Sequence, residues 1–358
     1  IPETDTVGAI QYSRILEPTR TGRPVDVYVT EAAQEMEAVL RREKPGVVIA
    51  ASNHLTGLPA LIASRRLGIP FVYEVRGFWE ITRLSREPEF SERQLYIDQV
   101  AMESCVCREA DLVLTLTGGM RDELLRRGVE RSKIAIVPNS CDIEDFVPIP
   151  KDMALAQRLG IEPEIPVIGY VGTFVDYEGL EDLATACGIL KRSGYKFRLL
   201  LVGNENASGT DTGPITDAIR ATAGTCDFAD WLIMPGRVPH DQVQSYYSLI
   251  DIAPFPRKPL PVCEIVSPMK PLEAMAMEKA VVVSSVGALG EMVADGETGL
   301  IYRKGDIYDL ADTLKRLIDD APLRKTLGER SRQWVAEHRT WQKSAGVALD
   351  AVKAKTQG

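Results

Sequence analysis

Short apolar runs alternate with segments whose apolar residues recur at helical spacing, and the alternation extends along most of the chain. In the first half, the strand-like runs are residues 25–30, 46–52, 70–76, 112–117 and 134–138. The helix-like segments between them are residues 31–43, 58–67, 91–109 and 118–127. Strands that alternate with helices in this way predict a parallel sheet with helices on both faces.

A second alternating series follows residues 145–152, which are rich in proline, lack periodicity and are predicted to form a linker. The expected strands are residues 166–172, 197–203, 231–235, 252–255 and 280–284. The expected helices are residues 179–192, 213–223, 241–249 and 268–277, followed by a mostly helical tail at 307–353. Ligands of such sheets bind beyond the carboxyl ends of the strands, so the sequence predicts two Rossmann-like domains, 1–150 and 151–337, that face each other across a cleft.

Composition fits an ordinary globular protein and argues against several classes of partner. Of the 358 residues, 45% are hydrophobic and 26% are charged, and no apolar run approaches the length of a membrane span. The formal net charge of −9 argues against a nucleic-acid partner and allows at most peripheral membrane contact. Among six cysteines only Cys105 and Cys107 are close, without the histidine that zinc spacing requires. We expect no metal site, and thiols that stay reduced in a cytoplasmic protein.

The amino-terminal residues depart from the pattern of a nucleotide-binding half. Such a half usually opens with a strand and a glycine-rich loop, but residues 1–24 contain no such pair, and residues 10–16 are a weak strand candidate. The sequence also does not begin with Met. We therefore expect that the first strand and loop have been cut away, are disordered or lie on another segment.

The densest group of candidate functional residues lies between residues 257 and 275. Ser267 is a good helix N-cap and Pro268 a good first helical residue. The amides of Met269 and Lys270 would then point out of the helix start, where the helix dipole also favours an anion.

Three cations surround this helix start. Lys270 lies within it, and Arg257 and Lys258 follow the preceding strand on the same rim. Glu273, one turn further on, could accept both hydroxyls of a ribose or simply stabilise the helix start. The pattern suggests a diphosphate site, and a capped helix with solvated cations around it explains the pattern equally well.

The same stretch, RKPLPVCEIVSPMKPLEAM, resembles the signature of family-4 glycosyltransferases, which adopt the two-domain GT-B fold. The family signature is a glutamate, seven residues, and a second glutamate followed by Ala-Met-Ala. Glu273 matches the second glutamate. The first is displaced, because Glu264 has eight residues between and Ile265 holds the in-register position.

Further segments resemble the family in the expected order, from about residue 45 to the end. They are residues 73–80 (YEVRGFWE), 137–142 (VPNSCD), 170–180 (YVGTFVDYEGL), 284–293 (SSVGALGEMV) and 295–300 (DGETGL). In the first of these, Trp79 could stack on an acceptor sugar or belong to the core.

The resemblance implies transfer of a hexose-type sugar, with retention, from a UDP- or GDP-linked donor to a glycan, lipid-linked or small-molecule acceptor. It implies no cofactor, a last helix at about 338–358 that returns to the first domain, and a cytoplasmic place that could include the inner membrane face. The implied catalytic residues are Glu264, Lys270 and Arg257. The implied donor-binding residues are Glu273, Lys258, Ser267, Met269, Gly172, Thr173, Arg237 and Val238. Arg76, Glu80, His54 and Asn139 are expected on the acceptor side.

Some positions differ from the family pattern. Many relatives hold the diphosphate with an Arg and a Lys where this chain has Thr173 and Glu178, so Arg257, Lys258 and Lys270 are expected to take over that duty. No general base can be inferred at residues 76–77, which are Arg-Gly. Two other functions remain open, a sugar-nucleotide epimerase of the same architecture and a catalytically silent scaffold.

Overall fold

The computed structural model describes residues 4–205 and 212–356. The chain forms two compact units, Ile1–Val137 with Gly346–Gly358, and Pro138–Ala345. The division expected after residue 150 lies after residue 137, and the return of the chain expected at about 338 begins at residue 346.

Residues 145–152 are not a free linker but a packed part of the second unit. Phe146 is buried, and its ring contacts the ring of Tyr247 edge-on, with centroids 6.2 Å apart. The side chain of Gln244 donates to the carbonyl of Asp145, and Arg332 Nη1 donates to the carbonyl of Phe146 at 2.9 Å. The prolines therefore mark an irregular segment, and the single aromatic side chain fixes it to the unit.

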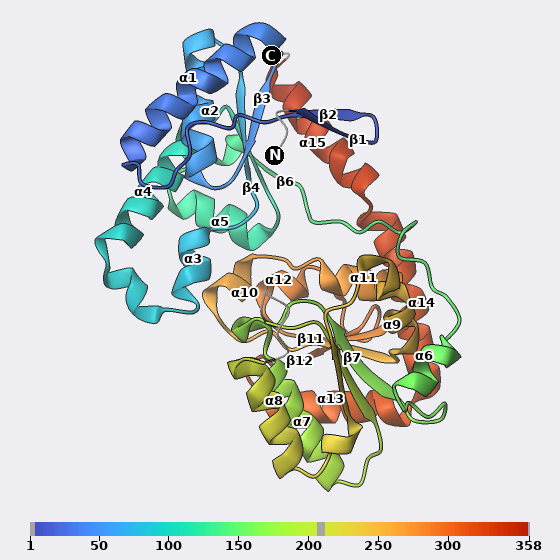
Figure 1. Ribbon diagram of the computed structural model, residues 1–358. Coiled ribbons are helices and arrows are strands. Elements are labelled where there is room, and N and C mark those ends of the chain that lie inside the picture. The colour runs from blue at the N-terminus through green and yellow to red at the C-terminus, as the bar shows by residue number, and fades with distance from the viewer. Residues whose placement is uncertain (1–3, 206–211, 357–358) are drawn as a thin grey trace. The chain divides into compact units, whose positions relative to one another are not determined.

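The first unit is built on a parallel sheet with strand order β3-β4-β5-β6 (Figure 1). Its strands are β3 (Val48–Ala51), β4 (Phe71–Val75), β5 (Leu112–Thr115) and β6 (Ile134–Ile136). Its helices are α1 (Val25–Glu43), α2 (His54–Leu67), α3 (Trp79–Leu84), α4 (Gln94–Glu109), α5 (Gly118–Arg126) and most of α15 (Trp341–Thr356). A separate antiparallel hairpin, β1 (Thr4–Val7) and β2 (Ile10–Ser13), precedes them.

The strand expected at residues 25–30 is wrong, because helix α1 begins at Val25. Val29, Ala32 and Ala33 are buried, so the apolar positions of this run continue the helical spacing of the segment that follows. Pro24 occupies the N-cap position, where its missing amide costs nothing. Burial of one helix face therefore outweighed the strand preference of the β-branched residues in this run.

Helix α15 completes the core of the first unit. Val72, Leu112 and Leu114 form a buried cluster on the sheet. Ala348, Ala351 and Val352 of α15 pack against that cluster. Val47, Ala135 and Val137, which lie in or next to the strands, pack against it as well. The end of the chain thus covers the sheet of the unit with which the chain begins.

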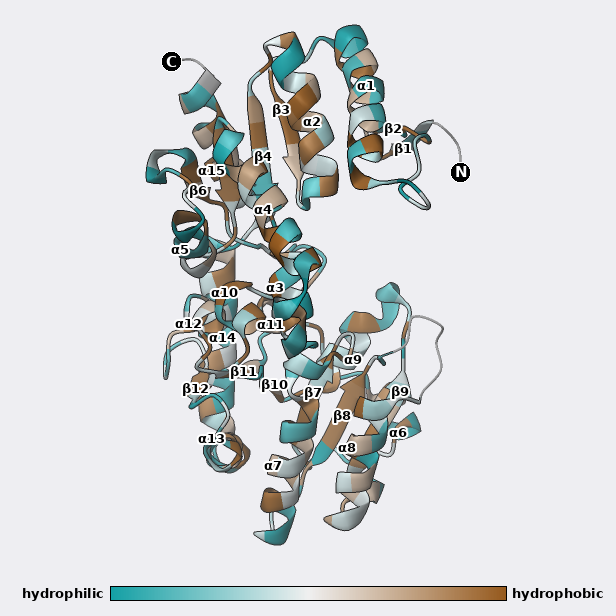
Figure 2. Cartoon of the chain, turned by 90° about the vertical axis from the view of Figure 1, so that its left-hand side faces the viewer, coloured by the Kyte–Doolittle hydropathy of each residue, from teal (hydrophilic) through white to brown (hydrophobic). Residues whose placement is uncertain are grey.

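The second unit is built on a six-stranded parallel sheet with order β12-β11-β10-β7-β8-β9. Its strands are β7 (Val167–Val171), β8 (Arg198–Val202), β9 (Leu232–Gly236), β10 (Ile252–Phe255), β11 (Ala280–Ser284) and β12 (Leu300–Tyr302). Its helices are α6 (Met153–Arg158), α7 (Leu180–Arg192), α8 (Pro214–Thr225), α9 (Val243–Leu249), α10 (Pro261–Ile265), α11 (Lys270–Ala276), α12 (Gly287–Gly290), α13 (Ile307–Asp319) and α14 (Ala321–His338). Figure 2 shows the apolar character of strand β8, which is buried along most of its length.

The strand order of the second unit reverses between β7 and β10. From β7 the chain adds β8 and β9 on one side, and then returns to add β10, β11 and β12 on the other. A doubly wound sheet opens a crevice outside the carboxyl ends of the strands at this reversal, and ligands bind there. None of the described helices, over 4–205 and 212–356, is long and apolar enough to cross a membrane.

Candidate functional site

The reversal point brings together residues that are far apart in the sequence. Gly172 directly follows β7, Arg257 lies just beyond β10, and Lys270 opens α11. The backbone of Gly172 has φ of +148°, and a Cβ added there would lie 2.2 Å from Lys270 Cε. Glycine at this position therefore makes room for the lysine stem.

A buried carboxylate stands between the two cations of this crevice. Glu178 Oε1 lies 3.4 Å from Lys270 Nζ and 3.7 Å from Arg257 Nη2. Arg257 is also fixed by its own hydrogen bond, from Nη1 to the carbonyl of Val266 at 2.8 Å. Glu178 is held here because the next residue, Gly179, packs on the β10 end, where an added Cβ would lie 2.1 Å from the carbonyl oxygen of Pro256.

Two buried atoms of this group have unused hydrogen-bonding capacity. Among the described residues, neither Glu178 Oε2 nor Arg257 Nε has a hydrogen-bond partner, and both residues are at least 96% buried, with exposed fractions of 3% and 4%. An unsatisfied buried polar group costs about 1–3 kcal/mol. Such groups mark a place where a polar ligand or ordered water would be stabilised.

The helix expected to begin at Pro268 begins at Lys270, and Ser267 is not its cap. Met269 is the N-cap residue, and its carbonyl accepts from the amides of Leu272 at 2.9 Å and Glu273 at 3.2 Å. Asn139 Nδ2 instead donates to the carbonyl of Ser267 at 2.8 Å. Asn139 was expected on the acceptor side, and this contact ties it to the loop before α11 within the second unit.

Two other candidate side chains are engaged elsewhere. Lys258 Nζ donates to Asp176 Oδ1 at 2.7 Å, and Asp176 is half exposed. Glu264 Oε1 accepts from Lys304 Nζ at 2.6 Å, and its Oε2 accepts from the amide of Gly287 at 2.9 Å. Asp176 thus neutralises Lys258, whereas Arg257 and Lys270 share the single carboxylate of Glu178 and keep a net positive charge.

Glu273 lies deeper on α11, next to a buried tyrosine. Tyr247 donates its hydroxyl to Glu273 Oε2 at 3.4 Å. Burial raises the pKa of Glu273 above its ordinary value, and the nearby charge of Lys270 partly opposes this rise. A carboxylate held in this way is a strong acceptor when ionised.

A hollow of about 150 Å³ lies at the carboxyl ends of β7, β8 and β9. It is lined by Val171, Gly172, Thr173, Val202, Gly203, Asn204, Arg237, Val238 and Val243. Four of these residues were expected to bind the donor, but Asn204 was not. Asn204 is 4% exposed, and its Nδ2 has no hydrogen-bond partner among the described residues. The sequence could have indicated Asn204 as a site residue, because it directly follows the strand expected at 197–203.

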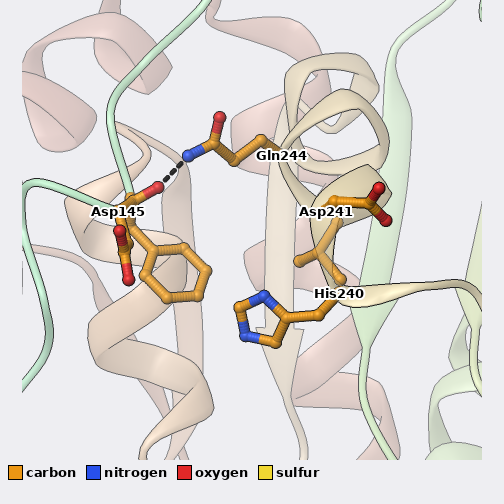
Figure 3. A pocket seen from close by; sticks show the side chains of 6 residues that line it. Asp145, His240, Asp241 and Gln244 are labelled. Atoms are coloured by element: carbon orange, nitrogen blue, oxygen red, sulfur yellow. Dashed lines mark hydrogen bonds between the residues drawn. The ribbon is translucent and has the colours of Figure 1, made fainter. Parts of the chain in front are cut away.

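Figure 3 shows a second hollow, of about 220 Å³. It is lined by Asp145, Phe146, His240, Asp241, Val243 and Gln244. Val243 lines both hollows. The rings of Phe146 and His240 lie edge to face, with centroids 6.4 Å apart. Sequence reasoning missed this hollow, because it treated residues 145–152 as a linker.

In the first unit, His54 belongs to a buried hydrogen-bond network with Glu103 and Tyr73. His54 is 4% exposed, its amide donates to Glu103 Oε2 at 2.7 Å, and its Nδ1 lies 3.5 Å from the same oxygen. Tyr73 donates its hydroxyl to Glu103 Oε1 at 2.7 Å, and burial raises the pKa of Tyr73. The network ties the start of α2 to β4 and α4.

The side chains that follow β4 differ widely in their exposure to solvent. Arg76 is exposed and pairs with Glu74 at 2.8 Å. Glu80 is 3% exposed and pairs with Arg127 at 2.7 Å, so it cannot contact an acceptor without rearrangement. Trp79 is 63% exposed, which excludes the core position that the sequence left open.

Family models match both halves of the chain. The model described as "Glycosyl transferases group 1" matches residues 153–334, and the model described as "Glycosyl transferase 4-like domain" matches residues 9–140. The first match contains β7 to β12 and the whole of the crevice described above.

Curated relatives carry names of the same activity class. The chain is 27% identical over 323 residues to D-inositol 3-phosphate glycosyltransferase of Stackebrandtia nassauensis, which covers 87% of this chain and 70% of the relative. It is 25% identical to alpha-maltose-1-phosphate synthase of Mycolicibacterium smegmatis, over 94% of this chain and 86% of the relative.

Solved glycosyltransferase structures share the fold. Sucrose-phosphate synthase from Thermosynechococcus elongatus superposes with a TM-score of 0.79 at 20% identity, covering 100% of this chain and 86% of that structure. HepE of Anabaena in complex with UDP gives 0.74 at 16% identity, covering 91% and 82%. The expected fold class, two Rossmann-like domains of the GT-B kind, is confirmed. The chain belongs to the group 1 family of glycosyl transferases.

Proposed function

We propose that this glycosyltransferase moves a hexose-type sugar from a nucleoside diphosphate to a glycan, lipid-linked or small-molecule acceptor, with retention at the anomeric carbon. Two relatives are named D-inositol 3-phosphate glycosyltransferase and alpha-maltose-1-phosphate synthase, and HepE was solved with UDP and with UDP-glucose. In the proposed reaction the bond from C1 to the β-phosphate oxygen breaks. A bond from C1 to the acceptor oxygen forms, and the hydroxyl proton leaves with the diphosphate.

The observation that carries the proposal is the meeting of Arg257 and Lys270 at the reversal point of the second sheet. The diphosphate gains negative charge as the sugar leaves, and fixed cations at that place stabilise the transition state. Arg257 is oriented by its hydrogen bond to the carbonyl of Val266, and its Nε has no hydrogen-bond partner within the part of the chain that the structure describes. We assign the leaving diphosphate to these two side chains.

The rest of the donor is assigned to the surrounding groups. An ionised Glu273 would accept the ribose hydroxyls, and the hollow that contains Asn204, Arg237 and Val238 would receive the base. Thr173 and Gly172 would border the diphosphate through backbone groups. Arg76 and Trp79, both exposed after β4, are the acceptor-side candidates that remain accessible.

The two alternative functions, a sugar-nucleotide epimerase and a catalytically silent scaffold, are less well supported. Membership of a glycosyl transferase family favours transfer over epimerisation. Unsatisfied buried donors and acceptors around the crevice favour a ligand site over a silent scaffold, because such groups are costly without a ligand or water. Acceptor-dependent release of the nucleoside diphosphate would separate transfer from epimerisation.

The first test is a thermal-shift panel of nucleoside diphosphates and sugar nucleotides. A ligand at 100 times its Kd stabilises the folded state by about 2.7 kcal/mol, so binding should raise the Tm visibly. The stabilising sugar nucleotide is then incubated with candidate acceptors, and the anomeric configuration of the product is determined by NMR. A chain that no sugar nucleotide or nucleoside diphosphate stabilises would overturn the proposal, and an inverted product would overturn retention.

A further inference from the structure

The carboxylate of Glu178 is the least expected group in the diphosphate crevice. It comes from the short 3-10 turn Asp176–Glu178, just before α7, and it is 3% exposed. Its Oε1 contacts both Lys270 Nζ and Arg257 Nη2, while its Oε2 has no partner among the described residues. A negative group therefore sits against the cations that the proposed function gives to a negative ligand.

Neighbouring acids do not share this position. Asp176 and Glu181 both lie near Lys258 Nζ, at 2.7 Å and 3.9 Å, so Lys258 compensates their negative charges. Glu178 alone among the described carboxylates is paired with Arg257 and Lys270. It reduces the net charge of that pair from two positive charges to one.

We propose that Glu178 is a built-in counter-charge that positions Arg257 and Lys270 and weakens the hold on the nucleoside diphosphate product. The inference rests on the proposed function and adds a role for a residue outside it. Before the donor binds, Glu178 compensates Arg257, whose buried charge would be costly without a partner. Once the donor is bound, the lysine can share its charge with the diphosphate, since its side chain is 24% exposed and Gly172 leaves its stem free.

The counter-charge acts more strongly on the product than on the donor. In the sugar nucleotide the terminal phosphate is esterified, whereas in the released diphosphate it is free. A free phosphate has a second pKa near 6, so it carries roughly one further negative charge at neutral pH. Repulsion by Glu178 therefore lowers the affinity for the product more than the affinity for the donor, and this favours release.

The test compares the binding of product and donor in matched variants. Calorimetry measures Kd for the nucleoside diphosphate and for the corresponding sugar nucleotide in the wild-type chain, in E178Q and in E181Q. Glu181 is a suitable control, since it lies in the first turn of α7 but near Lys258. We expect E178Q to bind the diphosphate about tenfold tighter and the donor about threefold tighter, whereas E181Q should change the ratio of the two Kd values less than twofold.

Kinetics provides a second readout that a merely structural role would not produce. In E178Q the inhibition constant of the diphosphate product should fall with its Kd, and kcat should fall because product release becomes slower. If E178Q does not fold, E178Q/K270M is compared with K270M, and the preference for product over donor should be larger in the double variant. A ratio of product to donor affinity that is unchanged or reduced in the folded variant would overturn the inference. Absence of diphosphate binding in the wild-type chain would instead overturn the proposed function, and this inference with it.

Discussion

Lys270 and Thr173 border the same glycine, yet only the lysine offers a charge to a diphosphate. Loss of one charged partner from a desolvated phosphate contact costs on the order of 2–5 kcal/mol. Lys270→Ala and Arg257→Ala should therefore each lower kcat/KM at least tenfold, which is about 1.4 kcal/mol. Thr173→Ala should be nearly silent, since Thr173 is exposed and the neighbouring Tyr170 hydroxyl bonds its backbone oxygen. Steady-state kinetics that ranked the variants in the opposite order would show that the diphosphate lies elsewhere.

Gly172 makes a separate prediction about the lysine stem. Its added Cβ would lie 2.2 Å from Lys270 Cε and 2.7 Å from Cδ, and its φ of +148° disfavours other residues. Gly172→Ala should lower donor affinity at least about threefold, because the ammonium group must move away from the crevice. Gly290→Ala is the control, since nothing lies within 4 Å of its added Cβ. Calorimetry that found equal donor affinities in the two variants would argue against a defined place for Lys270.

The raised pKa of Glu273 links nucleotide binding, stability and pH. A ribose site needs the carboxylate, so donor affinity should decline as pH falls through the raised pKa. The folded state holds the proton more tightly than the unfolded state does. Ionised Glu273 therefore costs stability at pH values above its raised pKa, and Glu273→Gln should relieve that cost there.

We accordingly expect Glu273→Gln to bind the diphosphate at least about tenfold more weakly while its Tm at neutral pH equals or exceeds that of the wild-type chain. The gain in Tm should vanish as pH falls below the ordinary glutamate pKa, near 4.3, because Glu273 is then protonated in both states. Melting curves and calorimetry across pH check both parts. A variant with unchanged affinity would remove the ribose role from Glu273.

Residue types at the site were predictable from the sequence, but their partners were not. Arg257, Lys270 and Glu273 could be singled out by composition and by the family pattern. The contact of Asn139 with Ser267 spans 128 positions, and no local pattern predicts it. The same holds for Lys304, which neutralises Glu264, and for Glu178, whose buried place depends on the fit of Gly179 against β10.

At the scale of elements, a buried ion pair joins α3 to α5. Arg127, at the C-cap of α5, contacts Glu80 at 2.7 Å and Glu123 at 2.7 Å, and its guanidinium lies 4.0 Å from the centroid of Phe78. Its side chain is 5% exposed. Arg127→Met should lower the free energy of unfolding by about 3–5 kcal/mol, because Glu80 is left buried without its cation.

The neighbouring Arg126 offers a matched control for that prediction. Its side chain is 71% exposed, although it also contacts Glu123. Arg126→Met should change the free energy of unfolding by less than about 1 kcal/mol, as expected for an exposed ion pair. Urea denaturation of the two variants measures the difference. Equal effects would mean that the buried pair of Glu80 and Arg127 stabilises the fold no more than an exposed ion pair does.

Elements with strong periodicity and clear ends were predicted well, and the exceptions have physical causes. The strands β4, β7 and β10 coincide closely with the expected apolar runs, since parallel strands are buried on both faces. Val25 to Thr30 became part of a helix, because neighbouring positions could extend one buried face. The late start of α11 reflects contacts of Ser267 with a distant asparagine, which outweighed a favourable capping sequence.

At the scale of the whole molecule, the chain crosses between its two units twice, after Val137 and before Gly346. The last helix, α15, therefore stabilises the first unit, against whose sheet it packs. Ala351 and Val352 of α15 pack against the buried cluster of Val72, Leu112 and Leu114. Damage to this helix should thus act on the sheet of the first unit and leave the crevice of the second unit intact.

Ala351→Asp tests this assignment, because it places a charge against the apolar cluster. The expected loss in the free energy of unfolding of the first unit is about 1–3 kcal/mol. Hydrogen exchange should accelerate in β4 and β5, whereas protection in β7 and β10 should persist. The variant should also keep the Kd of the wild-type chain for a nucleoside diphosphate, since no donor group lies on α15. Leu349→Asp is the control on the same helix, because Leu349 is 52% exposed and the change should be nearly silent. If Ala351→Asp accelerated exchange equally in β7 and β10, the two units would unfold as one, and the last helix would not belong to the first unit alone.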